Sequence, residues 1–255
     1  MKSLLENEHV DPNFVGDNGC SALHYAAIQG DVEKVKLLLE KGANVDIIDN
    51  YGNTPLHAAV ILKRTDVITS LLQKGANVNI QDEYGNTASH FAAEAGYQKA
   101  IDLLHKKNAD FTIKDHDNFT ALDHAIKSTK DTRDNIDSLS QATQDESSSQ
   151  DSDDDYSSTS SPQQYCYPKL CNLIHTIENL VSTEAVKQQD NAKFLLDTQF
   201  PTLLQSLGHY DIHNKNLANH NILESLDNVF EHWHEPTPTP VNLLTMGNLM
   251  QPIFE

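Results

Sequence analysis

Residues 53–59 read Asn-Thr-Pro-Leu-His-Ala-Ala, and this stretch indicates the fold because related stretches stand 33 residues before and after it. Glycine and histidine recur at the same spacing. The recurring positions are Gly19, Gly52 and Gly85, and His24, His57 and His90. A fixed period of this length indicates a repeat architecture, in which each unit is too small to bury its apolar side chains alone and stacks on its neighbours.

Within each unit the local signals predict a turn, a short helix, a second turn and a longer helix. In the second unit, residues 49–52 have the composition of a turn, Thr54 is suited to cap a helix and Pro55 to begin one. In the first unit, we expect Asp31 to cap the longer helix and Gly42 to end it. The leucines and valines of that helix form one apolar stripe, which should face the neighbouring helices.

The repeated pattern resembles that of ankyrin repeats. Residues 53–59 carry the resemblance, together with residues 35–46, which read Val-Lys-Leu-Leu-Leu-Glu-Lys-Gly-Ala-Asn-Val-Asp. It covers about residues 17–127 and implies an all-α solenoid of about four repeats that binds proteins on its concave face. Since the three histidines occupy the same slot in each unit, we expect them to share a structural task, hydrogen bonding between adjacent turns, rather than metal binding or catalysis.

Several positions depart from the repeated pattern. Ser89 stands where the first two units have leucine, and Lys63 replaces the glycine between the two helices of a unit. In the fourth unit Asn118 replaces the glycine of the turn and Asp123 replaces the histidine, and the helical pattern is lost beyond Ile126. We therefore expect the fourth unit to end as a fraying cap or to lean on the C-terminal region.

Acidic residues outnumber basic ones by 37 to 18, which gives a formal net charge of −19. No region has the basic surplus that binding to nucleic acid or to an anionic membrane requires. Residues 134–168 hold 8 acids and no base, so residues 131–167 are predicted to be a disordered, serine-rich linker. Ser148 and Ser152 each precede an acid by three residues, which resembles the sites of acidophilic kinases such as casein kinase 2. The linker is either a plain solubilising tether or a phosphorylated switch.

Helical periodicity returns after Pro168, with apolar residues spaced along one helix face up to Val181. The predicted fold is therefore an all-α ankyrin-repeat solenoid, then the acidic linker, then a small helical bundle or a single armadillo- or HEAT-like unit. The predicted divisions of the chain are an N-terminal cap or partial repeat at 1–16, the ankyrin domain at 17–130, the linker at 131–167, the helical domain at 168–234, and a proline-rich connector with an apolar tail at 235–255.

Specificity is expected in outward-facing slots where the repeats differ, which in ankyrin proteins are the turn tips and the exposed side of the first helix. The predicted partner-binding residues are Asn50, Tyr51, Asn53, Ile61, Leu62, Glu83, Tyr84, Asn86 and Phe119. Tyr51 and Tyr84 stand one repeat apart, and spaced aromatic side chains are good anchors for a partner. The alternative is that both tyrosines only pack against neighbouring turns.

No catalytic, cofactor or metal site is predicted. Three irregularly spaced cysteines, Cys20, Cys166 and Cys171, form neither a disulfide framework nor a zinc motif. His175 follows Cys171 by four residues, so a thiol–imidazole pair is the basis of an enzymatic alternative. The early acidic residues argue against a signal peptide, and the sequence holds no apolar run long enough to cross a membrane. These features predict a protein of the cytoplasm, with the nucleus as an additional location.

These features predict a non-enzymatic adaptor or scaffold. It would bind one protein on the concave face of the repeats and a second through the C-terminal helical region, with no nucleic acid, membrane, small-molecule or cofactor partner, and would be monomeric alone. Two alternatives stay open. One is an inhibitor of a transcription factor, similar to those of Rel-type factors and controlled by linker phosphorylation; the other is an ankyrin-targeted enzyme or effector that uses Cys171 and His175.

Overall fold

The computed structural model of the chain describes residues 11–146, 172–177 and 179–180. Within this part the regular elements are helices and no strand occurs, which confirms the predicted all-α fold there. The labelled helices are α2 (Ala22–Gln29), α3 (Val32–Glu40), α4 (Pro55–Ile61), α5 (Thr65–Gln73), α6 (Ala88–Glu94), α7 (Gln98–His105) and α8 (Ala121–Glu146). The described residues fall into two compact units, 11–92 with 99–121, and 93–98 with 122–146, 172–177 and 179–180.

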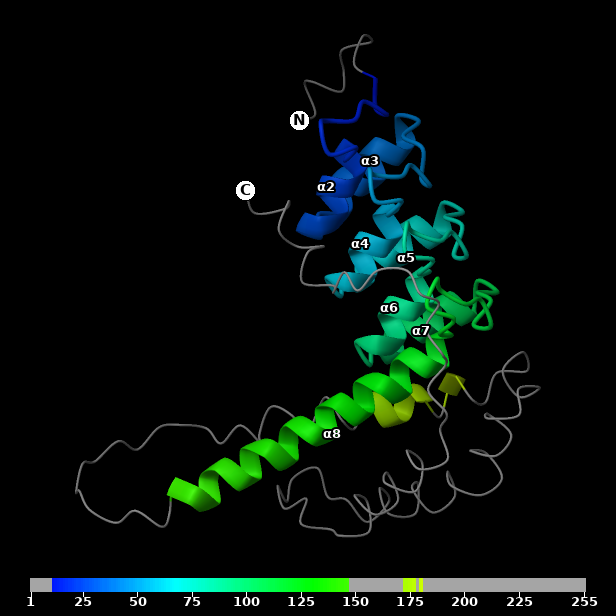
Figure 1. The fold of residues 1–255 in the computed structure, drawn as a ribbon. Helices are drawn as coiled ribbons and strands as arrows, with labels where there is room; N and C mark the ends of the chain where they lie inside the picture. The colour runs from blue at the N-terminus through cyan, green and yellow to red at the C-terminus, as the bar shows by residue number, and fades with distance from the viewer. Residues whose placement is uncertain (1–10, 147–171, 178, 181–255) are drawn as a thin grey trace. The chain divides into compact units, whose positions relative to one another are not determined.

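The helices of the first unit stack in pairs that follow the order of the chain (Figure 1). Helix α2 packs against α3 and also against α4, while α5 packs against α4 and α3. Each helix therefore buries its apolar side chains both against its partner and against the neighbouring repeat. Leu23, Leu56 and Leu71, one from each of three helices, are at most 1% exposed. This shared burial is what the 33-residue period encodes.

The predicted helix caps are present. The Thr54 hydroxyl accepts a hydrogen bond from the backbone N–H of His57, and Pro55 occupies the first turn of α4. Asp31 caps α3 by accepting from the backbone N–H of Lys34. Gly42, just after α3, has φ +88°, the left-handed conformation that suits glycine at a helix end. The predicted helix signals of the first and second units are thereby confirmed.

Close packing between neighbouring turn tips explains the recurring turn glycine. A Cβ atom on Gly85 would lie 2.7 Å from the backbone nitrogen of His116 in the next tip. In the fourth repeat the equivalent residue is Asn118, which keeps the left-handed conformation with φ +71°. Asparagine tolerates this conformation, and the repeat pattern provides no further tip to crowd its side chain.

Helix α8 corrects the predicted end of the repeat region. We expected helical structure to fade beyond Ile126 and a disordered linker to start at residue 131, whereas α8 is continuous over 26 residues to Glu146. Thr129 and Thr132 are buried, and each hydroxyl donates to the carbonyl four residues earlier, at 2.7 Å. Because each threonine hydroxyl is hydrogen-bonded within the helix, both threonines can be buried on the same face of α8 as the apolar residues before them. The rest of the predicted linker, 147–167, lies outside the described residues.

Residues 172–177 form a short helix, and residues 179–180 are also helical, in agreement with the helix predicted after Pro168. Leu173, Ile174, Ile177 and Leu180 are at most 2% exposed. The remaining parts of the predicted helical domain and of the C-terminal tail lie outside the described residues, as do residues 1–10 of the predicted N-terminal cap.

Candidate protein-binding surface

Each of three turn tips is fixed by one aspartate. The Asp49 carboxylate accepts from the backbone N–H groups of Tyr51 at 2.9 Å and Asn53 at 2.8 Å. Asp82 and Asp115 repeat this arrangement at intervals of 33 residues, each accepting from the backbone N–H groups two and four residues later at 2.8–2.9 Å. Such a turn holds its backbone in one conformation, so the tips form a rigid frame for the side chains that they carry.

Backbone hydrogen bonds also join each tip to the next. The Asn50 N–H donates to the Asn18 carbonyl at 3.2 Å. The Glu83 N–H donates to the Tyr51 carbonyl at 2.8 Å, and the His116 N–H donates to the Tyr84 carbonyl at 2.9 Å. The residues that accept at the second and third tips are the two tyrosines of the predicted binding site. Hydrogen bonds between the tips therefore fix the distance between the backbones of the two tyrosines.

The structure leaves both tyrosines partly accessible. Tyr51 and Tyr84 are half-buried, while Asn50 and Glu83 beside them are exposed. A hydrogen bond to the Glu83 carboxylate is the main cause that raises the pKa of the Tyr84 hydroxyl. Each tip thus presents an aromatic ring on a fixed backbone next to a polar or acidic side chain, an arrangement suited to anchoring a protein partner.

Three of the predicted contact residues do not point outward as expected. Asn53 is 7% exposed, Asn86 is 8% exposed and Phe119 is 6% exposed. They occupy equivalent positions in successive repeats, just before the first helix, where the chain enters the stacked helices. Backbone N–H groups in this slot donate to the aspartate of the tip, which draws the residue inward. The sequence showed that the slot varies but not that its side chains are covered.

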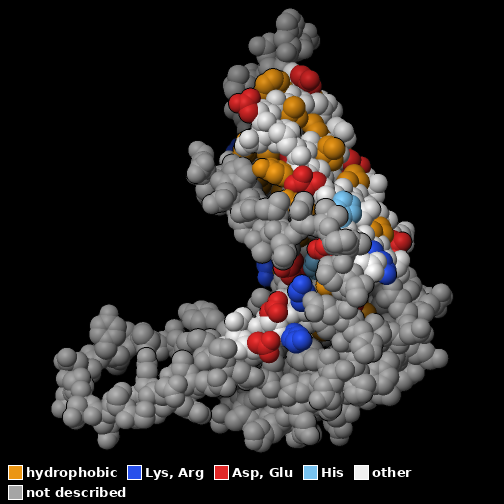
Figure 2. All heavy atoms as spheres, viewed as in Figure 1, with side chains coloured by type: hydrophobic (Ala, Val, Ile, Leu, Met, Phe, Trp, Pro, Cys, Tyr) orange, Lys and Arg blue, Asp and Glu red, His pale blue; other side chains and the backbone are white. Residues whose placement is uncertain are grey.

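Ile61 and Leu62 lie at the other end of the first helix of their repeat. Ile61 is the last residue of α4 and Leu62 is its C-cap, and both are half-buried. The face drawn in Figure 2 shows apolar and acidic side chains interleaved over the described residues of the first unit. The predicted phosphorylation sites, Ser148 and Ser152, lie outside the described residues, as does Cys171.

Several exposed apolar side chains, in the first repeat and on either side of it, were not predicted as contact residues. Phe14 is 74% exposed, Tyr25 is 51% exposed and Ile48 is 54% exposed. A signal was present for Tyr25, because its slot holds Ala58 in the next repeat, and a tyrosine at a position that accepts alanine is not required for packing.

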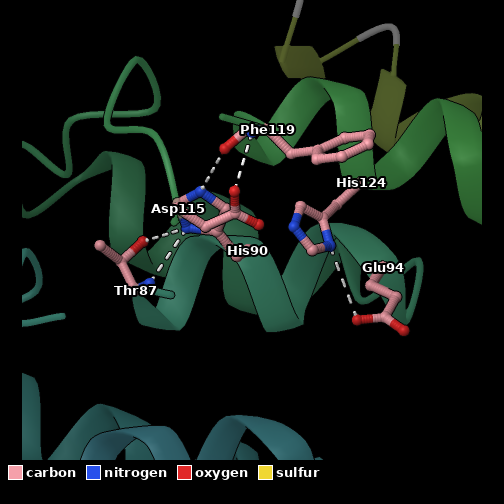
Figure 3. A network of polar contacts seen from close by, with 6 residues as sticks. All are labelled: Thr87, His90, Glu94, Asp115, Phe119 and His124. Carbon is pink, nitrogen blue, oxygen red and sulfur yellow. Dashed lines mark hydrogen bonds and ion pairs between the residues drawn. The ribbon is translucent and has the colours of Figure 1, made fainter. Parts of the chain in front are cut away.

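Two of the three repeated histidines, His24 and His90, make the structural hydrogen bonds that we predicted. The His24 Nε2 atom lies 2.9 Å from the Asn53 carbonyl oxygen, and the His90 Nε2 atom lies 3.2 Å from the Phe119 carbonyl oxygen (Figure 3). Each bond joins one repeat to the next. The His57 ring lies near the equivalent acceptor, the backbone of Asn86, but its Nε2 atom forms no hydrogen bond of comparable geometry among the described residues.

The other ring nitrogen fixes the tautomer of these histidines. At His24, His57 and His90 the Nδ1 atom accepts from the backbone N–H of the helix cap, at 3.0–3.1 Å. A nitrogen that accepts carries no proton, so each neutral ring carries its proton on Nε2, where it can be donated to the next repeat. Histidine thereby supplies the side-chain half of a capping box.

Burial keeps the rings of His24 and His57 neutral. Burial is the main cause that lowers the pKa of His57 to about 4, and it lowers the pKa of His24 as well. The neighbouring histidines lower the pKa of His57 further, since two adjacent charges would repel. Among the described residues no cluster of histidine, cysteine and acidic side chains is suited to hold a metal ion. The structural role of the repeated histidines rests on the hydrogen bonds that His24 and His90 make to the next repeat.

Among the described residues, no helix is both long enough and apolar enough to cross a membrane.

Paired helices, hydrogen-bonded tips and histidines that bond to the next repeat together define a helical repeat protein.

The comparisons with known proteins identify the repeat. Two family models match, one described as ankyrin repeats in three copies at residues 1–82 and the other as ankyrin repeats in many copies at residues 71–125. The N-terminal region of this chain therefore belongs to the ankyrin repeats.

Named relatives agree with this assignment. Neurogenic locus notch homolog protein 1 of Danio rerio is 48% identical over 50 residues, and neurogenic locus notch homolog protein 2 of Homo sapiens is 50% identical over 50 residues. Each alignment covers 20% of this chain and 2% of the relative. The similarity is thus confined to a short stretch of repeats.

Proposed function

We propose that this chain is a protein-binding adaptor whose first partner lies across the turn tips that carry Tyr51 and Tyr84. Ankyrin repeats are in general protein–protein interaction modules, and this supports the class of function. The observation that carries the proposed site is the hydrogen-bonded frame, in which the carbonyl of each tyrosine accepts from the next tip at 2.8 and 2.9 Å. A rigid frame lowers the entropy that is lost on binding.

The charge around the tyrosines indicates the chemistry of the partner. Asp17, Glu83 and Asp117 are exposed at three of the four tips. An acidic rim around two aromatic anchors fits a partner surface that offers apolar pockets bordered by lysine or arginine. Aromatic anchors of this kind typically account for more than 1–2 kcal/mol of binding free energy each, on the order of a tenfold change in affinity.

The test is affinity capture from cell lysate with three forms of the full chain: wild type, Tyr51→Ala/Tyr84→Ala and Tyr25→Ala. Tyr25 is the matched control because it is 51% exposed on α2 and stands apart from the tips. We expect a captured protein to be lost only from the double variant, with the helical circular dichroism of all three forms unchanged. Equal capture by the three forms would remove the tips from the binding site.

The remaining parts of the predicted function stay proposals. A second partner of residues 168–234 would make the chain bivalent, and loss of all binding on deletion of residues 145–161 would instead favour a phosphorylation-controlled inhibitor. Labelling of Cys171 by a thiol-reactive probe, at a rate far above that of the half-buried Cys20, would favour the enzyme. We also propose the cytoplasm as the location, with the nucleus as an additional one; imaging of the tagged chain would test it.

A further inference from the structure

The turn between α6 and α7 is in contact with residues far along the chain. A Cβ atom on Gly96 would lie 3.1 Å from both the backbone nitrogen and Cγ of Leu173, and 3.3 Å from the carbonyl carbon of Asn172. These separations are tighter than ordinary van der Waals contact, so the helix at 172–177 approaches the turn as closely as a residue without a side chain permits. Both partners belong to the second compact unit.

Residues 172–177 and 179–180, here named the capping segment, bury one complete apolar face. Leu173, Ile174, Ile177 and Leu180 are spaced along one side of a helix and are at most 2% exposed, whereas Asn172 and His175 are exposed. Figure 1 draws the segment in yellow next to α8. Isolated helices shorter than about 12–15 residues are marginal in water, so the contact surface is what stabilises this short helix.

The backbone conformation at Gly96 does not by itself require glycine. Its counterparts one and two repeats earlier are Lys63 and Gly30, and Lys63 adopts a left-handed conformation there with φ +54°, close to the +57° of Gly96. At Gly30 a Cβ atom would meet only the flexible side chain of Arg64, at 3.0 Å from Cδ. A side chain is therefore tolerated in this slot except where the capping segment lies against it.

Another contact within the second compact unit joins α8 to the end of α6, and it is an ion pair when the His124 ring is protonated. The His124 Nδ1 atom lies 3.8 Å from a carboxylate oxygen of Glu94, two residues before Gly96 (Figure 3).

From these contacts we propose that the capping segment is an intramolecular cap that docks on the turn at Gly96. The region after the acidic linker is then not a free second arm, since its first helix is already bound within its own chain. A partner protein reaches the apolar face of the capping segment only when the segment leaves Gly96, so the contact restrains the second binding event. This inference does not depend on the proposed site at Tyr51 and Tyr84.

The test compares two lysine substitutions in the full chain by hydrogen exchange. Gly96→Lys copies the residue found naturally at position 63, and Gly30→Lys places the same side chain in the same slot of the first repeat. In wild type we expect the amides of residues 173–180 to exchange at least tenfold more slowly than in a free peptide. Gly96→Lys should abolish this protection, and Gly30→Lys should leave it unchanged. Free-peptide rates in wild type, or protected amides in Gly96→Lys, would overturn the proposal.

A second variant separates release of the cap from general unfolding. Leu173→Asp leaves the repeats untouched, so it should expose residues 173–180 to exchange while the amides of α2–α5 keep their wild-type rates. A synthetic peptide of residues 168–181 should then bind the Leu173→Asp chain, whose docking surface is vacant, and should bind neither wild type nor Gly96→Lys. Equal binding of the peptide to Gly96→Lys and to Leu173→Asp would show that Gly96 is not the docking surface.

Discussion

Acid should destabilise the repeats through His57, the buried ring whose pKa is lowered to about 4. An unfolded chain binds a proton at this histidine below about pH 6.5, whereas the folded chain binds it only near pH 4. Between these values the unfolded state holds more protons, so the free energy of unfolding falls as the pH is lowered. The contribution of the neutral ring is fully present above pH 6.5 and is lost as the pH falls through about 4.

The size of the effect follows from the two pKa values. A difference of one unit corresponds to about 1.4 kcal/mol, so at pH 4.5 the ring should cost about 2–3 kcal/mol of stability relative to pH 7.5. Small domains have total stabilities of about 5–15 kcal/mol, so such a loss is readily measured. The pKa of His24 is also lowered by burial and acts in the same direction, whereas the raised pKa of the buried Asp82 acts in the opposite direction.

Urea denaturation of the full chain, followed by circular dichroism at several pH values from 7.5 to 4.5, measures this dependence. His57→Gln keeps a polar side chain of similar size but cannot titrate, so its stability should fall by about 2–3 kcal/mol less than that of wild type over this range. His116→Gln is the control, because His116 is exposed at a turn tip. If wild type and His57→Gln lost stability in parallel, the ring would not be buried and neutral, and the structural role assigned to the repeated histidines would fail.

Four further substitutions test the packing by urea denaturation near pH 7.5. Gly75 and Gly85 have φ values of +86° and +85°, but only a Cβ on Gly85 meets the next tip, so Gly85→Ala should destabilise clearly more than Gly75→Ala; equal losses would refute the close approach. Ser89 is 1% exposed and its hydroxyl has no partner among the described residues, so Ser89→Ala should stabilise by about 1 kcal/mol, and a loss of stability would reveal a missed hydrogen bond. Leu71→Ala removes a fully buried side chain and should cost about 2–5 kcal/mol; a cost below 1 kcal/mol would contradict its place in the core.

The local structure of the repeats could be predicted from sequence because its causes are local. Thr54 and Pro55 begin α4 through interactions within one turn, and the 33-residue period fixes which residues of neighbouring units meet. The structural role of His24 follows in the same way, since a residue repeated in one slot makes one kind of contact. Helix α8 was not predicted, because Thr129 and Thr132 interrupt the apolar pattern of the sequence. Both are nevertheless buried, since their hydroxyls are hydrogen-bonded within the helix itself.

The pairing, capping and stacking of the helices follow from the amino-acid sequence alone, because each of these properties depends on residues at fixed, short or periodic separations. Which variable side chains face solvent emerges only in the folded chain: Tyr51 is half-buried at a tip while Asn53, two residues later, is covered. The contact of Leu173 with Gly96 likewise emerges only there. No period relates those two positions, and burial depends on everything packed nearby, so such contacts arise only once the whole chain is folded.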